Sequence, residues 1–276
     1  MTETHIIASV IFIFGSIIGS FLNVCIVRWP HEKSVITPRS HCVHCEKMIP
    51  WYDNIPFISY LLLGGRCRFC KKKISARYLI VEFVTGAAFV GFYLYFGLSA
   101  KFFAYLVMLA GFIVATFVDF EHRIIPDEVS IGGMCVGLVL SLFLPVLHGV
   151  EVGSTFSVWP YLISLGYSVI GVLVGGGSIY AMGLLGDVLF KKESMGGGDV
   201  KLMAMVGAFL GWKIAVLAFF LAPFFGAVYG IIEKIRTKDS AIAYGPFLVL
   251  GTLLALFYGE LIITWITGGY GIYNPY

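Results

Sequence analysis

The chain has 276 residues, of which 59% are hydrophobic and only 13% are charged. Soluble domains carry about 25% charged residues, so this composition excludes an ordinary cytosolic protein. The net charge of +3 says little as a total, and we expect no nucleic-acid partner.

Long apolar segments follow one another along the chain, and they are uncharged except for Glu82 near the start of the run 79–98. A membrane-spanning helix needs about 17 to 25 apolar residues, and seven runs approach or reach that length: 6–27, 79–98, 102–118, 129–147, 158–186, 214–232 and 241–259. The first run lacks the basic start of a signal peptide and is followed by Arg28, so we predict a retained helix. A shorter run, 202–212, is predicted to be an eighth crossing.

The positions of the basic residues favour this eighth crossing. If the amino terminus lies outside and 202–212 crosses, the cytoplasmic segments hold 17 of the 19 lysines and arginines. Such an excess is typical of cytoplasmic loops in membrane proteins. If 202–212 did not cross, Lys234, Arg236 and Lys238 would lie outside. The cytoplasmic segments are then 28–78, 119–128, 187–201 and 233–240.

The expected fold is therefore an all-α polytopic membrane protein with about eight transmembrane helices. Residues 1–27 form the first helix, 28–78 a cytoplasmic insert, and 79–276 a membrane domain with seven further helices. Within the run 158–186, the triplet Gly175-Gly176-Gly177 predicts close helix packing, with a hinge as the alternative.

The insert 28–78 is polar, basic and aromatic, and it predicts a zinc site. It contains two C-x2-C pairs separated by 21 residues, a spacing typical of structural zinc sites, in which thiolates bind the metal tetrahedrally. A redox pair or unliganded thiols are the alternatives. His41 and His44 are possible substitute ligands, although we expect them to be exposed loop residues. The predicted ligands are Cys42, Cys45, Cys67 and Cys70.

Two further features of the insert lie beside the membrane. The basic run Lys71-Lys72-Lys73 suits binding to anionic membrane lipids, and steering of a charged cytosolic peptide is its alternative role. The aromatic motif Trp51 to Pro56 suits anchoring at the level of the lipid headgroups.

Two carboxylates stand beside apolar runs. Asp119 ends the run 102–118, and Asp199 closes the sequence Met195-Gly196-Gly197-Gly198-Asp199. An ionisable residue at a membrane segment is costly and marks a candidate functional site. Two of them suggest an aspartyl pair that shares one proton, in which one member activates water and the other polarises a peptide carbonyl. The alternative is a short re-entrant turn in which Asp199 caps the next helix.

Neighbouring residues are expected to support this pair. The glycines Gly196 to Gly198 are predicted to permit backbone angles and a close approach of peptide that a side chain would block. Lys201 is expected to tune Asp199 or to mark the membrane interface. Asp127 is predicted to N-cap a helix that begins at Glu128.

Several motifs occur in a fixed order along the chain: Gly19-Ser20-Phe21-Leu22-Asn23-Val24, the two cysteine pairs, Trp51 to Pro56, Gly65-Arg66-Cys67, Arg77-Tyr78 with Val81-Glu82, Asp119 with Ile125-Pro126-Asp127, and Met195 to Asp199 with Lys201. In these motifs the chain resembles the bacterial type IV prepilin peptidases, also called leader peptidase/N-methyltransferases. This family is of the GxGD aspartyl type, and its catalytic aspartates fall on Asp119 and Asp199. The resemblance covers nearly the whole chain.

The resemblance implies a bifunctional enzyme of the bacterial inner membrane whose active site faces the cytoplasm. It would remove the basic leader from prepilins of type IV pili, or from pseudopilins of type II secretion, after a glycine. It would then methylate the new amino terminus, usually phenylalanine, with S-adenosylmethionine as the methyl donor. No G-x-G-x-x-G follows a strand, so only its position suggests the insert as the methyl-donor site.

Two alternatives remain at this point. One is a peptidase without methyl transfer. The other is a zinc-stabilised membrane transporter that uses Asp119 and Asp199 as proton relays. A transporter is disfavoured because such proteins show paired repeats and broken helices at the membrane midplane, whereas this chain shows no repeats and no midplane charges.

Overall fold

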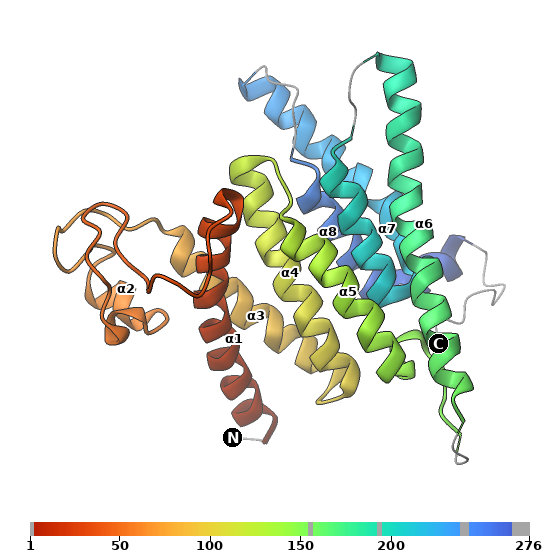
Figure 1. The fold of residues 1–276 in the computed structure, drawn as a ribbon, viewed down its shortest axis with the longest axis horizontal. Coiled ribbons are helices and arrows are strands. Elements are labelled where there is room, and N and C mark those ends of the chain that lie inside the picture. Colours follow the sequence, from red (N-terminus) through yellow and green to blue (C-terminus); the bar gives the residue numbers. More distant parts are fainter. Residues whose placement is uncertain (1–2, 154–156, 192–194, 238–242, 267–276) are drawn as a thin grey trace. The chain divides into compact units, whose positions relative to one another are not determined.

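The computed structural model describes residues 3–153, 157–191, 195–237 and 243–266, and within these ranges it consists of helices and loops without a strand (Figure 1). This confirms the predicted all-α class. The α-helices are α1 (Glu3–Arg28), α2 (Ile58–Leu62), α3 (Arg77–Phe96), α4 (Ala100–His122), α5 (Asp127–Phe143), α6 (Trp159–Phe190), α7 (Gly197–Thr237) and α8 (Gly245–Ile266). Three short 3-10 helices are η1 (Trp29–His31), η2 (Trp51–Asn54) and η3 (Pro145–His148).

Among the described residues, five helical segments are long and apolar enough to cross a membrane. They lie in α1, α3, α4, α6 and α7, and α8 contains a shorter apolar stretch, Gly245–Gly259. The chain is therefore a multi-pass membrane protein by the length and composition of its helices. The number of eight crossings stays a prediction.

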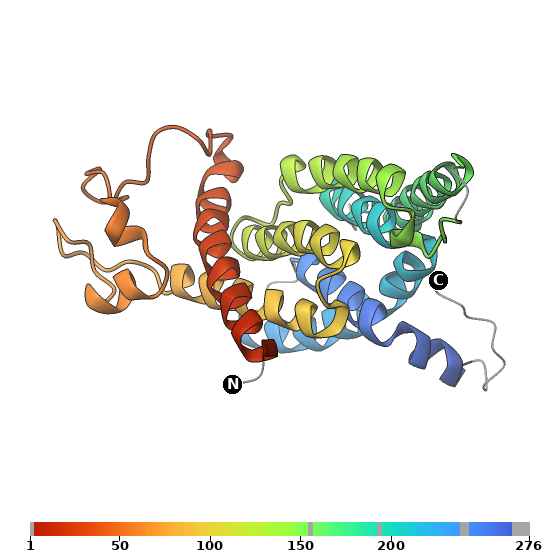
Figure 2. The same cartoon turned by 90° about the horizontal axis from the view of Figure 1, so that it is seen from below.

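The chain divides into two compact units, residues 1–114 and 115–276. In the first unit α1 packs against α3 through small residues (Figure 2). A Cβ atom added at Gly15 would lie 2.9 Å from the Cα atom of Gly86, and one added at Gly19 would lie 2.8 Å from that of Glu82. Such close approach of backbones stabilises helix pairs inside membranes.

The predicted boundaries of the insert and of the membrane domain stay predictions.

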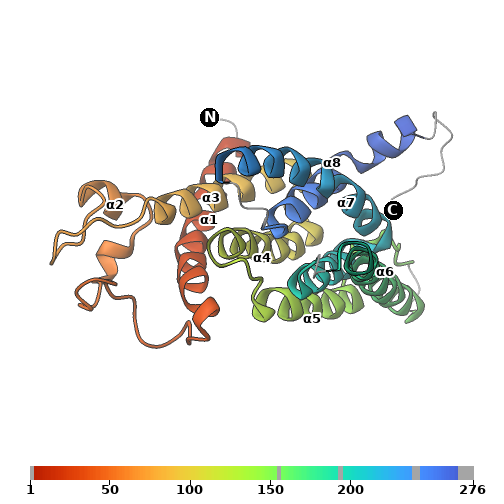
Figure 3. The same cartoon turned by 90° about the horizontal axis from the view of Figure 1, so that it is seen from above.

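In the second unit α5, α6 and α7 lie together (Figure 3), and glycines again allow close contact. A Cβ atom at Gly171 would overlap the carbonyl of Gly207, and one at Gly175 would overlap the carbonyl of Met203. The hydroxyl of Ser168 also donates a buried hydrogen bond of 2.7 Å to the carbonyl of Ala208. Close packing is therefore confirmed at Gly175.

The helix α7 is broken at Gly211, whose φ of 75° and ψ of 173° are not helical. Met203 and Ala215, on either side of this break, both lie against Gly175. In a straight helix twelve residues would separate them by about 18 Å, so the chain turns back at Gly211. Glycine adopts this positive φ without the strain of a side chain. The turn lies at the predicted boundary between the short run 202–212 and the run 214–232.

Labelling from outside tests the predicted topology. We expect a cysteine near Gly149, for example at Val150, to react with a membrane-impermeant thiol reagent, and cysteines at Lys72 or Arg123 not to react, because basic loops stay in the cytoplasm. Three further predicted positions lie outside the described residues: Lys192 and Lys238, expected inside, and Asn274, expected outside. External labelling at Lys238 would show that 202–212 does not cross.

Candidate functional site

Asp119 and Asp199 come together in the second unit. Asp119 lies in the last turn of α4 and Asp199 in the first turn of α7. Only 5% of Asp119 and 9% of Asp199 is exposed, and the charge of Asp119 acts directly on Asp199. Buried carboxylates are costly unless they are paired or hydrogen-bonded. Two buried carboxylates whose charges act on each other form an arrangement in which one proton can be shared.

The start of α8 holds Asp119 in place. The backbone N–H of Gly245 donates a hydrogen bond of 2.9 Å to Oδ2 of Asp119. A Cβ atom at Gly245 would lie 2.9 Å from the same oxygen, which is closer than a methyl group and an oxygen can approach without displacement. The absence of a side chain at this residue therefore leaves room for the carboxylate.

Tyr244, the residue before this glycine, lies beside the other carboxylate. The half-buried side chain of Tyr244 lies within reach of the charge of Asp199. A phenol has an ordinary pKa of about 10, so it keeps its proton at neutral pH and is a hydrogen-bond donor next to Asp199.

Of the two roles predicted for the glycines before Asp199, the special backbone angles are wrong, and the room for a close approach of peptide stays a prediction. None of the three has a positive φ, so the expectation of special backbone angles is wrong. Gly198 instead provides space, because a Cβ atom there would lie 3.1 Å from Cβ of Ile125. Gly197 faces open space, and the carbonyl of Gly196 accepts the N–H of Asp199 at 3.1 Å.

The prediction that Asp127 N-caps a helix is also wrong. The helix α5 begins at Asp127 itself, and Pro126 occupies the cap without a side-chain hydrogen bond. Oδ1 of Asp127 instead accepts a hydrogen bond of 2.7 Å from Nζ of Lys201. Asp127 therefore binds a residue 74 positions away instead of capping its helix. A local capping pattern does not reveal such a partner. Lys201 accordingly pairs with Asp127 and joins the start of α5 to the start of α7.

Two residues of this site, Tyr244 and Gly245, are not singled out by the sequence analysis. The available signal is the dipeptide Gly245-Pro246 inside the apolar run 241–259, because Gly and Pro interrupt regular structure. The signal indicates a helix boundary, and α8 does begin at Gly245. It does not indicate that the backbone there contacts Asp119.

The four cysteines of the insert come together in the first unit. Their Sγ atoms all lie within 4.8 Å of one another, with separations of 3.8 Å between Cys42 and Cys70 and 3.9 Å between Cys45 and Cys67. Tetrahedral zinc with bonds of about 2.3 Å places its sulfur ligands about 3.8 Å apart. The cluster therefore has the size and ligand set of a metal site. His41 and His44 are exposed and do not join it.

Both cysteine pairs are built by the same backbone turn. In the first turn the N–H of Cys42 donates to the carbonyl of Lys47, and the N–H of Glu46 donates back to the carbonyl of Cys42. In the second turn Cys67 makes the equivalent bonds with Lys72 and Lys71. The N–H groups of Cys70 and Phe69 lower the pKa of the Cys67 thiol to about 6, which favours the thiolate form that binds metals.

Comparison with known proteins agrees with this division of sites. Residues 13–96 match the bacterial Peptidase A24 N-terminal domain, and residues 106–231 match the type IV leader peptidase family. The prepilin leader peptidase/N-methyltransferase of Aeromonas hydrophila is 32% identical over 93% of this chain and 92% of its own length. The type 4 prepilin-like proteins leader peptide-processing enzyme of Escherichia coli O78:H11 is 33% identical over 88% of this chain and 91% of its own length.

A third relative is the prepilin leader peptidase/N-methyltransferase of Myxococcus xanthus, which is 35% identical over 82% of this chain. The chain belongs to the type IV leader peptidase family. The match with the Myxococcus protein spans 63% of that protein's length. No solved structure matches the chain.

The family match separates the two candidate sites. Asp119 and Asp199 both lie in the stretch that matches the type IV leader peptidase family, and the four cysteines lie in the N-terminal match. Tyr244 and Gly245 follow the family match. The structure, and not the family match, places these two residues beside the aspartates.

Proposed function

We propose that this chain is an intramembrane aspartyl peptidase that removes the leader from prepilins or type II secretion pseudopilins after glycine. It then methylates the new amino terminus with S-adenosylmethionine. The observation that carries the peptidase activity is the buried pair of Asp119 and Asp199. Two of the relatives named above are called prepilin leader peptidase/N-methyltransferases, and the third is called a leader peptide-processing enzyme.

In the proposed peptidase reaction one carboxylate is ionised and the other carries a proton. The ionised member takes a proton from water, whose oxygen then bonds to the carbonyl carbon, and the protonated member donates to the carbonyl oxygen. Collapse of this adduct breaks the C–N bond, and the amine of the mature pilin leaves with a proton. Gly245 fixes the orientation of Asp119 for these transfers through its N–H bond to Oδ2.

The remaining groups are assigned as follows. The cluster of four cysteines binds one structural zinc ion, because its sulfur separations suit tetrahedral thiolate coordination. S-adenosylmethionine supplies an electrophilic methyl group on a sulfonium. The protein is a multi-pass protein of the bacterial inner membrane, with its active site at the cytoplasmic side and Lys71 to Lys73 in contact with membrane lipids.

One experiment tests both activities. Purified protein is incubated with a prepilin and methyl-labelled S-adenosylmethionine, and the mass and label of the pilin product are measured. We expect a shortened pilin that carries label on its new amino terminus. A shortened pilin without label would show a peptidase that lacks methyl transfer, and an unshortened prepilin would contradict the proposal.

The two activities are expected to be separable. Methyl transfer needs a neutral amine aligned with the donor methyl group, and neither aspartate is required for that step. We therefore expect Asp199→Asn to lose cleavage but still to methylate a pilin that was cleaved beforehand. Failure of this variant to methylate the cleaved pilin, with its metal content and fold intact, would show that both reactions share one site.

Substitution of Gly245 by alanine tests how closely Asp119 must be placed. The new methyl group would lie 2.9 Å from Oδ2 of Asp119 and must displace either the carboxylate or the start of α8. A catalytic group misplaced by 1 Å can cost about a hundredfold in rate, and we expect a loss of that order in leader cleavage. Gly132→Ala is the matched control, because nothing lies within 4 Å of the added atom. Equal activity of both variants would contradict the role of Gly245.

A further inference from the structure

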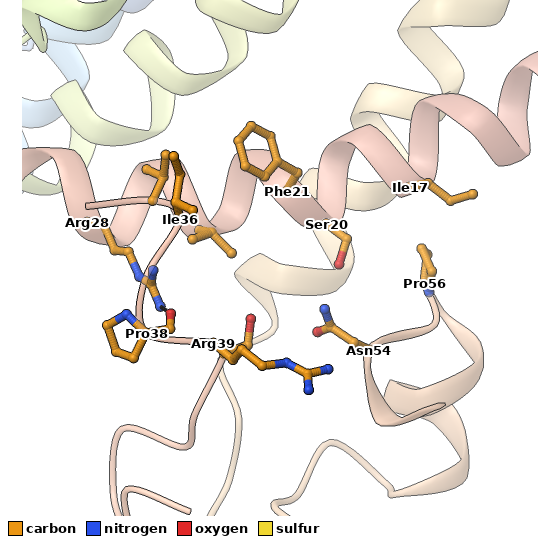
Figure 4. A pocket seen from close by; sticks show the side chains of 12 residues that line it. Ile17, Ser20, Phe21, Arg28, Ile36, Pro38, Arg39, Asn54 and Pro56 are labelled. Carbon is orange, nitrogen blue, oxygen red and sulfur yellow. Dashed lines mark hydrogen bonds between the residues drawn. The ribbon is translucent and has the colours of Figure 1, made fainter. Parts of the chain in front are cut away.

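Two motifs of the sequence, Gly19 to Val24 and Trp51 to Pro56, belong neither to the aspartyl pair nor to the cysteine cluster. In the first unit both border one cavity of about 320 Å³, between the second half of α1 and two loops of the insert (Figure 4). Ser20 and Phe21 line it from α1, and Asn54 and Pro56 from the second motif. Pockets for small molecules typically have volumes of about 300 to 1,000 Å³. We call this space the α1 cavity.

The first wall of the α1 cavity is held by a buried arginine. Arg28, at the end of α1, is only 8% exposed. Its guanidinium donates hydrogen bonds of 2.9 Å to the carbonyl of Ser34 and 2.7 Å to that of Pro38. The carbonyl of Ser40, which also lines the cavity, accepts the N–H of Ile49 at 2.8 Å. This wall is therefore joined to the turn that carries the first cysteine pair.

The second wall is tied to the other cysteine pair. Asp53, beside Asn54, accepts two hydrogen bonds of 2.6 Å from the guanidinium of Arg68, which lies between Cys67 and Cys70. These bonds hold the pKa of Asp53 below its usual value. A two-pronged contact of this kind fixes orientation as well as distance. The cysteine cluster therefore holds both loops that enclose the α1 cavity.

The residues that line the α1 cavity suit a partly polar ligand that carries a carboxylate. The side chain of Arg39 lines the cavity, and among the described residues no carboxylate pairs with its guanidinium. In Figure 4 the side chains of Arg39 and Asn54 both extend into the space beside α1. A free guanidinium suits a carboxylate ligand, which it can bind with two hydrogen bonds.

The opposite side of the α1 cavity adds an aromatic ring and a hydroxyl group. Phe21 is half exposed and presents a flat apolar surface that can stack on a purine ring. The hydroxyl of Ser20 hydrogen-bonds the buried carboxyl group of Glu82, which also accepts the N–H of Phe57 at 3.0 Å.

We propose that the α1 cavity binds the methyl donor S-adenosylmethionine, with Arg39 on its carboxylate, Phe21 on its adenine ring and Asn54 on its polar edges. The inference rests on the proposed methyl-transfer function, and it names the residues that hold the donor. It also explains the position of the cysteine cluster, which fixes both enclosing loops. A membrane lipid, whose phosphate Arg39 could also bind, is the competing occupant.

The test measures binding of methyl-labelled S-adenosylmethionine to the full chain in nanodiscs that contain phosphatidylglycerol. We expect Arg39→Ala to weaken binding about tenfold or more, because a hydrogen-bonded charge pair is lost, and Asn54→Ala to weaken it by a smaller factor. The matched control is Lys33→Ala, which removes an exposed cation nearby that does not line the cavity. Metal content and thermal unfolding of each variant show that it is folded. Ultraviolet cross-linking should attach the label to α1 or to the loops 35–40 and 54–56.

The outcomes distinguish this inference from the function on which it rests. If the wild-type chain binds no donor, the methyl-transfer function is wrong and this inference is wrong with it. If the wild-type chain binds the donor and both cavity variants bind it equally well, methyl transfer stands and the assignment of the cavity is overturned. Loss of bound phosphatidylglycerol in Arg39→Ala without any change in donor binding would identify a lipid site and would also overturn it.

Discussion

Asp119→Asn and Asp199→Asn are each expected to lose leader cleavage by a factor of about a hundred to ten thousand, the range typical of general acid–base groups. Each amide keeps the size of the carboxylate but does not exchange a proton at neutral pH. The carbonyl oxygen of an asparagine at position 119 can still accept the N–H of Gly245, so the geometry of that contact is preserved. The rate of cleavage of a purified prepilin, followed by mass, measures the effect.

Asp127→Asn is the matched control for this experiment. Asp127 and Lys201 form an ion pair whose side chains are 59% and 43% exposed, and exposed pairs contribute at most about 1 kcal/mol. We expect cleavage to change by less than about fivefold. An inactive Asp127→Asn together with an active Asp119→Asn would show that the aspartates are wrongly assigned.

The helices of this fold follow directly from the sequence. The predicted run 79–98 corresponds to α3 (Arg77–Phe96), and the run 102–118 lies within α4 (Ala100–His122). Membrane helices satisfy all backbone hydrogen bonds within one segment, so an apolar run of sufficient length determines its own structure. The position of Asp119 near the end of α4 is visible in the sequence for the same reason.

The contacts between distant segments do not follow from the sequence. The N–H of Gly245 and the carboxylate of Asp119 are 126 residues apart, and no local pattern relates them. The predicted cap at Asp127 failed for the same reason, because capping patterns are local and the actual partner, Lys201, is 74 residues away. Close helix packing at Gly175 could be predicted, because glycine spacing within one helix is a local feature.

Removal of the metal site is expected to have the second large effect. We predict one zinc ion per chain, and we expect each single change of Cys42, Cys45, Cys67 or Cys70 to serine to abolish stoichiometric binding. Structural zinc in small modules contributes on the order of 10 kcal/mol of folding free energy, far more than the hydrogen bonds of the two turns. Elemental analysis measures the zinc, and limited proteolysis of residues 28–78 measures the loosening of the insert.

Cys135→Ser is the matched control. Cys135 is an exposed residue of α5, so its substitution should leave the zinc content unchanged. A pure, reduced protein without zinc, or a disulfide between the two cysteine pairs, would contradict the prediction.

The effect of zinc removal on donor binding is a further test of the α1 cavity. The bond between the carbonyl of Ser40 and the N–H of Ile49 joins one loop of the α1 cavity to the first cysteine pair, and Asp53 with Arg68 joins the other loop to the second pair. Since both loops depend on the cluster, a chelator should weaken binding of S-adenosylmethionine as zinc is lost. The aspartyl pair is held by α4, α7 and the start of α8 and does not include the cluster. Zinc loss that left donor binding unchanged would separate the metal from the cavity.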